Sequence, residues 1–540
     1  MSVERGTLVV DGSSGAERIA ALVAGIGLLL VVASVALLFG VVNATSTLGG
    51  VAAADLVGAA LAVAGGVLLG VGGASRAGLI ETNPSSTVGV VVGVGFGALG
   101  AVAGGLVASQ TFGLATLWPL AALAAGGLVA LATALPREDV GSTLPAGGFA
   151  LVAGFLVLAD VVGPGWRWQP IPGSATFPGD AAIATLALLG GLAVAWSAAR
   201  AYDGFGTRGR QAGAHLLVSV NAAAMVALLV ALVLFVLSRG WEPMTRGVRL
   251  GLFTEPVFWF YLPPIGEWVI VEAPGVWFYW PFVMEGATLT NEINGVAPAV
   301  VGTVWLVVGA VLFAVPLGVG AAVFLTEYAD QGRFTRLVEI STNGLWSTPS
   351  IVYGLFGLAL LVPRLGNTNS IFTGQLVLGV MLLPLVVITS REALLSVPDE
   401  YRDASAALGV SKWETIRSVV LPAAMPGVIT GVILGVGRIA GETAPILLVT
   451  AGEPFPARGP KLLGSFAFTS SFPFVDIVNT EPLFQPASAL PYQLYAVITA
   501  GVGENLAFGW GTALVLLLVV LGFYAVGIAS RVYFRRKLQA

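Results

Sequence analysis

Cysteine is absent from this chain, and histidine occurs once, at His215. These absences exclude disulfide bonds, zinc sites built from cysteine and histidine, and catalysis by a cysteine nucleophile. Lysine occurs only at Lys412, Lys461 and Lys537, and none of the three forms the Gly-Lys-Ser/Thr sequence of a phosphate-binding loop. The chain is therefore not predicted to be an ATPase. We expect it to be no enzyme and to bind no cofactor or metal.

Charged side chains are also scarce, at 10% of the 540 residues, whereas hydrophobic residues make up 56% and the mean hydropathy is +0.91. Most of this length must lie in lipid, so the composition predicts an all-α, polytopic membrane protein. The 72 glycines suit close packing of transmembrane helices through small faces. Acidic residues exceed basic ones, 29 to 25, and this balance favours a salt-adapted, halophilic source.

Apolar runs long enough to span a bilayer predict about twelve transmembrane helices. The runs lie near residues 18–42, 51–74, 87–109, 114–135, 146–164, 182–199, 214–238, 297–325, 341–363, 374–390, 423–450 and 511–530. An orientation with both termini in the cytoplasm places most Lys and Arg residues in cytoplasmic segments, in agreement with the positive-inside rule. The chain is therefore expected to be a multi-pass protein of the cell membrane.

A basic, glycine-rich segment at 200–213, RAYDGFGTRGRQAG, divides the chain and is expected to be a cytoplasmic linker with few hydrophobic anchors. Residues 1–212 then form an N-terminal extension of six spans, in which no motif indicates a role. Residues 213–540 form a second domain of six spans, which contains all the informative motifs. Its external loop, 239–296, is acidic and aromatic, and fits either a docking surface for an external partner or an anchor at the lipid headgroups.

The most informative segment is the polar stretch 400–422, EYRDASAALGVSKWETIRSVVLP, which lies between two apolar runs on the cytoplasmic side. Its small residues predict a short helix with a thin side that fits a groove of a partner protein, and Arg402, Lys412 and Arg417 are expected to keep this helix in water. The spacing matches the EAA loop of ABC-importer permeases, and this resemblance implies that the loop binds an ATPase. The residues that carry the assignment are Asp403, Ala404, Ser405, Gly409, Leu421 and Pro422. A solvated loop between two spans is the alternative interpretation.

Within that family, residues 213–540 resemble the PstA-type permease subunits of phosphate importers. The matching segments are FLTEYAD at 324–330, STPSIVYGLFG at 347–357, the loop itself, GRIAGETAPIL at 437–447 and QPASALPYQLY at 485–495. The resemblance implies a six-helix, type I-like permease domain in a prokaryotic membrane that imports inorganic phosphate. It also implies three partners: a PstC-like permease, a PstB-like ATPase dimer that binds ATP, and a PstS-like phosphate-binding protein. Permeases for molybdate, tungstate or sulfate, and an ion-coupled secondary transporter, are the alternatives.

Arg438 and Glu442 are charged residues within the predicted span 423–450. Their spacing places them on one face of a helix, where the side chains can meet. Because a charge in hydrocarbon costs about 3 kcal/mol, they should face the bundle interior or a water-filled path. Either they form a purely structural ion pair, or Arg438 offers its guanidinium to phosphate, with Glu442 neutralising it between cycles and Thr443 adding a hydroxyl donor. Pro445 is expected to kink the helix.

Two further features concern helix packing. Gly437 and Gly441 are expected to thin the helix of the charged pair so that a neighbour can approach. The segment 347–350, Ser-Thr-Pro-Ser, offers hydroxyl groups at the start of a predicted span, a place that favours anions. Because it lacks a positive side chain, we expect it first to be a packing or hinge feature.

Overall fold

The computed structural model describes residues 15–540 except 115, 170–172, 174, 252–254, 263, 265–266, 274–276, 287–294, 331, 457, 469–474, 479, 501–505 and 540. The secondary structure of the described part is helical apart from five two-stranded antiparallel sheets, which confirms the all-α prediction. The chain divides into two compact units, Met1–Leu229 and Val230–Ala540. The border falls inside one helix, α7 (Gly206–Thr245). The functional boundary at 212/213 stays a prediction, because a compact unit is not by itself a functional domain.

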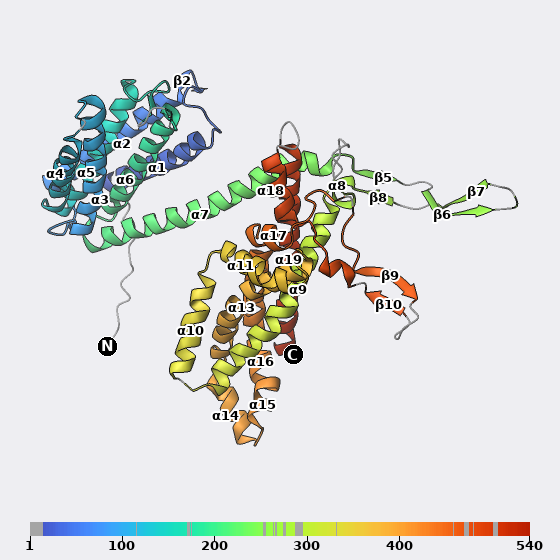
Figure 1. Ribbon diagram of the computed structural model, residues 1–540. Coiled ribbons are helices and arrows are strands. Elements are labelled where there is room, and N and C mark those ends of the chain that lie inside the picture. Colours follow the sequence, from blue (N-terminus) through green and yellow to red (C-terminus); the bar gives the residue numbers. More distant parts are fainter. Residues whose placement is uncertain are drawn as a thin grey trace, which may run out of the picture. The chain divides into compact units, whose positions relative to one another are not determined.

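The first unit contains six helices before α7 (Figure 1). They are α1 (Gly15–Leu38), α2 (Ala53–Arg76), α3 (Val90–Leu106), which continues into the π-helical turn η1 (Val107–Thr111), α4 (Trp118–Ala134), α5 (Glu138–Leu158) and α6 (Gly179–Tyr202). Two short hairpins join them, β1 (Thr47–Leu48) with β2 (Val51–Ala52), and β3 (Arg167–Trp168) with β4 (Phe177–Pro178).

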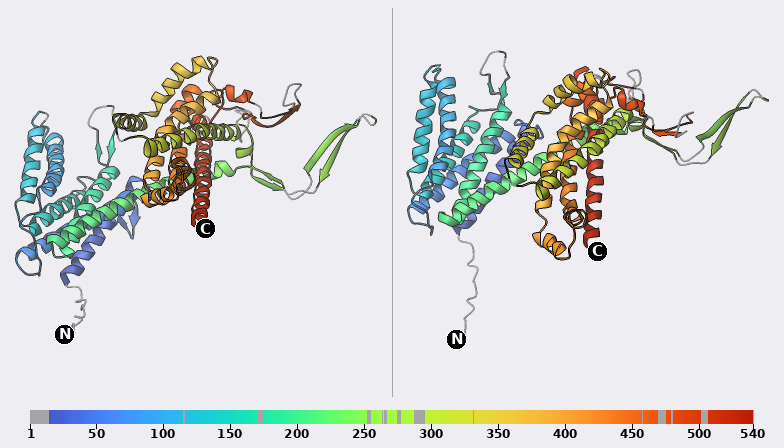
Figure 2. Two further views of the ribbon diagram at one scale, coloured as in Figure 1. Left: turned by 90° about the horizontal axis from the view of Figure 1, so that it is seen from below. Right: turned by 60° about the horizontal axis from the view of Figure 1, so that its bottom comes forward.

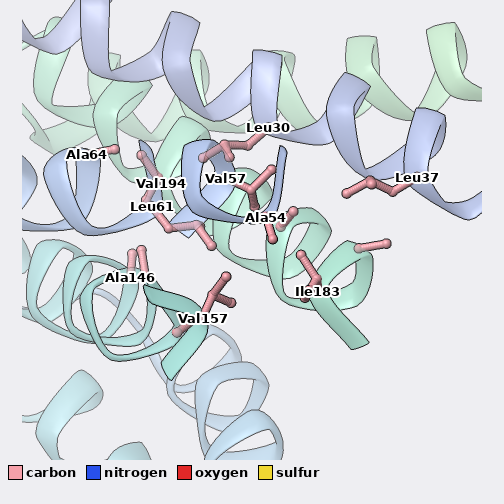
Figure 3. Packing of buried hydrophobic residues seen from close by; sticks show 14 of the residues in the cluster. Leu30, Leu37, Ala54, Val57, Leu61, Ala64, Ala146, Val157, Ile183 and Val194 are labelled. Atoms are coloured by element: carbon pink, nitrogen blue, oxygen red, sulfur yellow. The ribbon is translucent and has the colours of Figure 1, made fainter. Parts of the chain in front are cut away.

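The core of this unit is built from nested helix pairs, with α1 packed on α6, α2 on α5 and α3 on α4. Glycines allow the close approach: a Cβ added at Gly27 would lie 2.7 Å from the carbonyl oxygen of Gly191. Side chains from four of these helices, Leu30, Leu61 and Ile183 among them, meet at the centre (Figure 3). The small faces that the glycine content predicted are therefore used for packing between helices.

The segment predicted as a linker, 200–213, is instead ordered and packed within the first unit. Helix α6 ends at Tyr202 and α7 already begins at Gly206. Arg200 is buried in an ion pair with Glu138, the first residue of α5, and its guanidinium also lies 4.8 Å from the ring centroid of Trp196. Phe205 is 2% exposed. The linker prediction was wrong because a basic, glycine-rich composition does not reveal a buried carboxylate on a distant helix.

The second unit contains the C-terminal part of α7 and the remaining elements. Its helices are α8 (Pro281–Met284), α9 (Ala297–Val323), η2 (Phe324–Tyr328), α10 (Arg333–Trp346), α11 (Ser350–Phe356), η3 (Gly357–Leu361), α12 (Val362–Arg364), α13 (Ile371–Leu395), α14 (Asp399–Ala407), α15 (Lys412–Thr415), η4 (Ile416–Val420), α16 (Leu421–Ala440), α17 (Ala444–Val449), η5 (Glu481–Phe484), α18 (Leu490–Ala500) and α19 (Ala507–Gln539). Its strands are β5 (Arg249–Gly251), β6 (Glu255–Leu262), β7 (Glu267–Ala273), β8 (Trp277–Tyr279), β9 (Leu463–Phe468) and β10 (Val475–Val478).

Long helices form the body of this unit, with α9 against α13, α13 against α16, and α16 against α19. Its main core joins α9, α11, α13, α16 and α17, with Leu306, Leu378 and Ile439 nearly inaccessible. The external loop predicted at 239–296 contains two two-stranded sheets, β5 with β8 and the hairpin β6–β7, and this hairpin projects away from the helices (Figure 2). Most side chains of its aromatic run lie outside the described part, so both interpretations of this loop stay predictions.

Ten helices in the described part are long and apolar enough to cross a membrane, or up to eleven if the bent pair 333–346 and 350–364 is one span. This range agrees with the prediction of about twelve spans. With the bent pair counted as the run predicted at 341–363, the remaining run, 114–135, forms α4, which has only 17 residues, whereas a perpendicular span needs about 20.

Candidate functional site

The polar stretch between α13 and α16 folds as a short helix, a turn and a second helix start. Helix α14 (Asp399–Ala407) has two acidic residues in its first turn, where they favour the helix dipole. It ends in a Schellman motif: the Gly409 amide donates to the Ala406 carbonyl at 2.9 Å, and the Val410 amide donates to the Ser405 carbonyl at 3.1 Å. Gly409 has a φ of +71°. The glycine is therefore required by the left-handed backbone, a reason that the sequence pattern did not supply.

The six residues assigned to ATPase coupling fall into two groups. Asp403, Ala404 and Gly409 are exposed on the short helix and its turn. Ser405 is buried and its hydroxyl donates to the Tyr401 carbonyl at 2.9 Å, so it fixes the helix rather than facing a partner. The other two, Leu421 and Pro422, are half-buried in the first turn of α16, which continues α15 and η4 without a break. The role of the six in ATPase coupling stays a prediction.

Exposed apolar side chains surround the same turn, and the motif gave no indication of them. Leu408 is 82% exposed, Trp413 57% and Tyr401 51%. Apolar side chains gathered on a polar turn are typical of a protein interaction site. They extend the predicted docking surface beyond the small residues of the motif.

Arg402 does not simply face water, as the sequence suggested. Its Nη2 donates to Oε1 of Glu327 at 2.7 Å, and its Nε donates to the same oxygen at 3.2 Å. Its Nη1 and Nη2 also donate to the carbonyls of Val397 and Leu394 at 2.9 and 3.2 Å. The hydrogen bond to Glu327 raises the pKa of Arg402. Lys412 likewise lies 5.0 Å from the ring centroid of Tyr328, whereas Arg417 is exposed as expected.

The second candidate region lies where α16 ends. The helix stops at Ala440, and α17 begins at Ala444 with Pro445 in its first turn. The prediction of Arg438 and Glu442 within one continuous helix was therefore wrong, and so was the expected kink, because Pro445 starts a new helix. The side chains nevertheless meet across the end of α16, with Nε of Arg438 3.7 Å from Oε1 of Glu442.

A second helix break lies against the first one. Helices α10 and α11 are bent by 101° at residues 347–349. A Cβ added at Gly354 of α11 would lie 2.9 Å from the Cα of Pro445, so α11 and α17 are in close contact. The hydroxyls of Ser347 and Thr348 donate back to the Gly344 carbonyl, both at 2.9 Å. This geometry supports the bend rather than an anion site at this segment.

The two breaks bring a tryptophan under the charged pair. The guanidinium carbon of Arg438 lies 4.2 Å from the ring centroid of Trp346, the last residue of α10. A cation held over an indole gains about 0.5–2 kcal/mol. The Arg438 side chain remains 31% exposed and that of Glu442 18%, while Thr443 is half-buried just before α17. Trp346 was not among the predicted site residues, although an aromatic residue directly before the Ser-Thr-Pro segment was a visible signal.

The helix behind the pair is thinned at one of the two glycines proposed for this purpose. A Cβ added at Gly437 would collide with the hydroxyl of Tyr524 on α19, whereas one at Gly441 would have only the Arg438 carbonyl nearby, at 4.0 Å. In the described part of the chain, no group of three His, Cys, Asp or Glu residues is placed to hold a metal ion.

Comparison with known proteins decides the family. Residues 314–539 match the family described as the binding-protein-dependent transport system inner membrane component. The chain is 36% identical over 264 residues to a probable ABC transporter permease protein, YqgI, of Bacillus subtilis, covering 48% of this chain and 85% of that protein. The chain belongs to this permease family.

A second curated relative agrees with this assignment. The permease is 32% identical over 296 residues to the phosphate transport system permease protein PstA 1 of Mycobacterium tuberculosis, covering 52% of this chain and 88% of that protein. A solved structure of the MetNI methionine ABC transporter, in an inward-facing conformation, matches with 17% identity and a TM-score of 0.34 over 44% of this chain and 94% of that one.

The family settles several of the predictions. The permease is a multi-pass, non-catalytic subunit of an ABC importer, and ATP is bound by a partner ATPase. An ATPase and a substrate-binding protein are its partners. An ion-coupled secondary transporter is thereby excluded.

Proposed function

We propose that this permease imports inorganic phosphate across the plasma membrane of a prokaryote, with both of its termini in the cytoplasm. Its partners would be a PstC-like permease, two PstB-like ATPases and a PstS-like phosphate-binding protein. The similarity to the PstA 1 permease supports this proposal, because 88% of that protein is covered. A permease of the same family for another tetrahedral oxyanion is the competing function.

The observation that carries the proposal is the environment of Arg438. A guanidinium offers a planar fork of donors that matches a phosphate oxyanion. The contact with Glu442 uses Nε and is long, 3.7 Å, so the carboxylate balances the charge without occupying the fork. No hydrogen bond from the Arg438 fork to another described residue competes for it. Trp346 holds the cation from below, which leaves the fork free to donate to a passing anion.

Arg438→Gln tests this role in the complex reconstituted with its partners in proteoliposomes. We expect the variant to assemble and to hydrolyse ATP, but phosphate uptake should fall about 10- to 100-fold, because one charge-assisted hydrogen bond is lost and glutamine keeps a neutral donor in place of the other. Arg438→Lys keeps the charge without the fork, so its uptake should be intermediate. Arg364→Gln is the matched control. Arg364 is the last residue of α12, is exposed, and donates to the Leu360 carbonyl.

The outcomes separate the interpretations. Near-normal phosphate uptake by Arg438→Gln would remove Arg438 from the path. Loss of the assembled complex would instead identify a structural ion pair, since an unpaired carboxylate would remain partly buried. Uptake of radioactive phosphate that excess sulfate or molybdate abolishes more effectively than unlabelled phosphate would assign the importer to another oxyanion.

We also propose that residues 1–212 are an extension separate from transport, with residues 213–540 as the permease domain. The family match begins at residue 314, and both relatives described above cover about half of the chain. The extension has a hydrophobic core of its own, built from α1, α2, α5 and α6.

A further inference from the structure

The segment FLTEY at the end of α9 belongs to one of the motifs shared with PstA-type permeases, but the proposed function assigns no role to it. It forms the π-helical turn η2 (Phe324–Tyr328), so that α9 and η2 form a continuous helix of 32 residues, Ala297–Tyr328. At 1.5 Å per residue this helix is about 48 Å long and can reach across a bilayer. Single π-helical turns inside α-helices are frequent at functional sites.

Glu327 in this turn is held by Arg402 of α14. The side chain of Glu327 is 8% exposed and that of Arg402 23%, so the pair is shielded from water. The guanidinium also donates to the carbonyls of Leu394 and Val397, at the end of α13, and to the carboxylate of Asp399 at 3.2 Å. One side chain thus connects the ends of α9, α13 and α14.

Tyr328, the next residue, is held from the other side of the Gly409 turn. The ammonium group of Lys412, at the start of α15, lies 5.0 Å from its ring centroid. The two cations that flank the polar turn therefore both contact neighbouring residues of η2. If the Gly409 turn moves as a rigid unit, either the end of α9 moves with it or both contacts, Arg402–Glu327 and Lys412–Tyr328, break.

The opposite end of α9 packs against and hydrogen bonds to the segment QPASALPYQLY at 485–495, another motif to which the proposed function assigns no role. A Cβ at Gly302 would collide with the Ser488 carbonyl, and the Leu490 amide donates to the Thr303 hydroxyl at 2.9 Å. Next to this contact is a cavity of ≈ 390 Å³. Pro298 of α9 lines it together with Arg458, Lys461 and Ser488. Helix α9 therefore links the coupling turn at one end to a cavity at the other, which is lined by two cationic side chains and by the carboxylate of Glu453.

We propose that α9 receives the motion of the ATPase-coupling turn, with Glu327 and Tyr328 as the positioning residues that tie it to Arg402 and Lys412. The inference rests on the proposed function only in taking this turn as the ATPase contact. When the ATPases close, the turn carries the inner end of α9 with it, and the rigid helix changes the cavity at its outer end. The salt bridge transmits force because both partners are shielded and the guanidinium is bound on several sides.

The absence of cysteine from this chain allows a direct measurement, since labels attach to the purified subunit only at introduced positions before it is assembled with its partners. Spin labels at Val304→Cys, on the outer part of α9, and Thr368→Cys, just before α13, report the distance between these helices in the assembled complex with and without ATP. We expect an ATP-dependent change in this distance. Glu327→Gln should assemble and hydrolyse ATP, but lose that change and reduce the phosphate moved per ATP by about two- to thirtyfold.

The matched control is Glu339→Gln. Glu339 pairs with Arg391 at 2.6 Å and joins α10 to α13 with a comparable geometry, but it does not involve the coupling turn. It should keep the ATP-dependent distance change. If Glu327→Gln does not assemble, Arg402→Lys decides, because it keeps a charge near Glu327 and gives up the fork that binds both the carboxylate and the carbonyls. We expect a reduced distance change in that variant.

The proposal would be overturned if the assembled Glu327→Gln complex showed the same ATP-dependent change in distance as the wild type. If Glu327→Gln does not assemble, the same result in Arg402→Lys would overturn it. Failure of the proposed function looks different. A wild-type complex that moves no phosphate but shows the ATP-dependent distance change, lost in Glu327→Gln, would contradict phosphate import while supporting the role of α9.

Discussion

Substitution of Gly409 gives a test of ATPase docking in which backbone strain and contact with the partner can be separated. The residue has a φ of +71° and ends α14 in a left-handed conformation. A Cβ added there would have no other atom within 4 Å. The cost of Gly409→Ala in the isolated subunit is therefore backbone strain alone, about 1–2 kcal/mol.

That cost has a defined consequence for the turn. It lowers the population of the native turn about 5- to 30-fold relative to open alternatives. Gly409→Trp has the same backbone strain, and its ring extends into water, so the two variants should differ in subunit stability by less than about 0.5 kcal/mol. Gly409→Asn should cost least, because asparagine adopts the left-handed region more readily than other residues with a side chain.

Binding of the purified ATPase to these variants supplies the decisive comparison. If the ATPase groove closes around the turn, the indole must displace partner atoms, and Gly409→Trp should bind at least about tenfold more weakly than Gly409→Ala, a difference of about 1.4 kcal/mol. The comparison with alanine removes the strain that both variants share. Equal ATPase affinities for Ala and Trp, with normal transport by both, would refute the assignment of this turn as the docking site.

Three further changes have defined outcomes. Gly437→Ala should destabilise the purified subunit by about 1–3 kcal/mol through its collision with the hydroxyl and ring of Tyr524, whereas Gly441→Ala, the control, should melt like the wild type, and equal melting temperatures of the two variants would contradict this. Glu138→Gln should lower the melting temperature of the first unit, since it leaves the buried guanidinium without its carboxylate, at a cost of about 3–5 kcal/mol, and an unchanged melting curve would contradict this. A chain that begins at Arg208 should still insert and support phosphate uptake with its partners, and normal insertion and assembly without uptake would show that the extension belongs to the transport machinery.

The amino-acid sequence by itself determined the class of this protein and singled out the segment that is predicted to contact the ATPase. Few charges and long apolar runs exclude a water-soluble globule, because each span must fill the bilayer with side chains that need no water. In such a background a polar stretch such as 400–422, or a charged residue such as Arg438, stands out without any structural information. Local composition is sufficient for these conclusions since the surrounding solvent is lipid.

Only the tertiary structure decided which polar groups are paired and where the helices break. Arg402 and Arg200 look equally solvent-exposed in sequence, yet their carboxylate partners lie 75 and 62 residues earlier, on other helices. Trp346 comes to lie under Arg438 only because the bend between α10 and α11 packs against the break between α16 and α17. Such contacts depend on the packing of segments that are distant along the chain, and no local pattern of hydrophobic and polar residues contains that information.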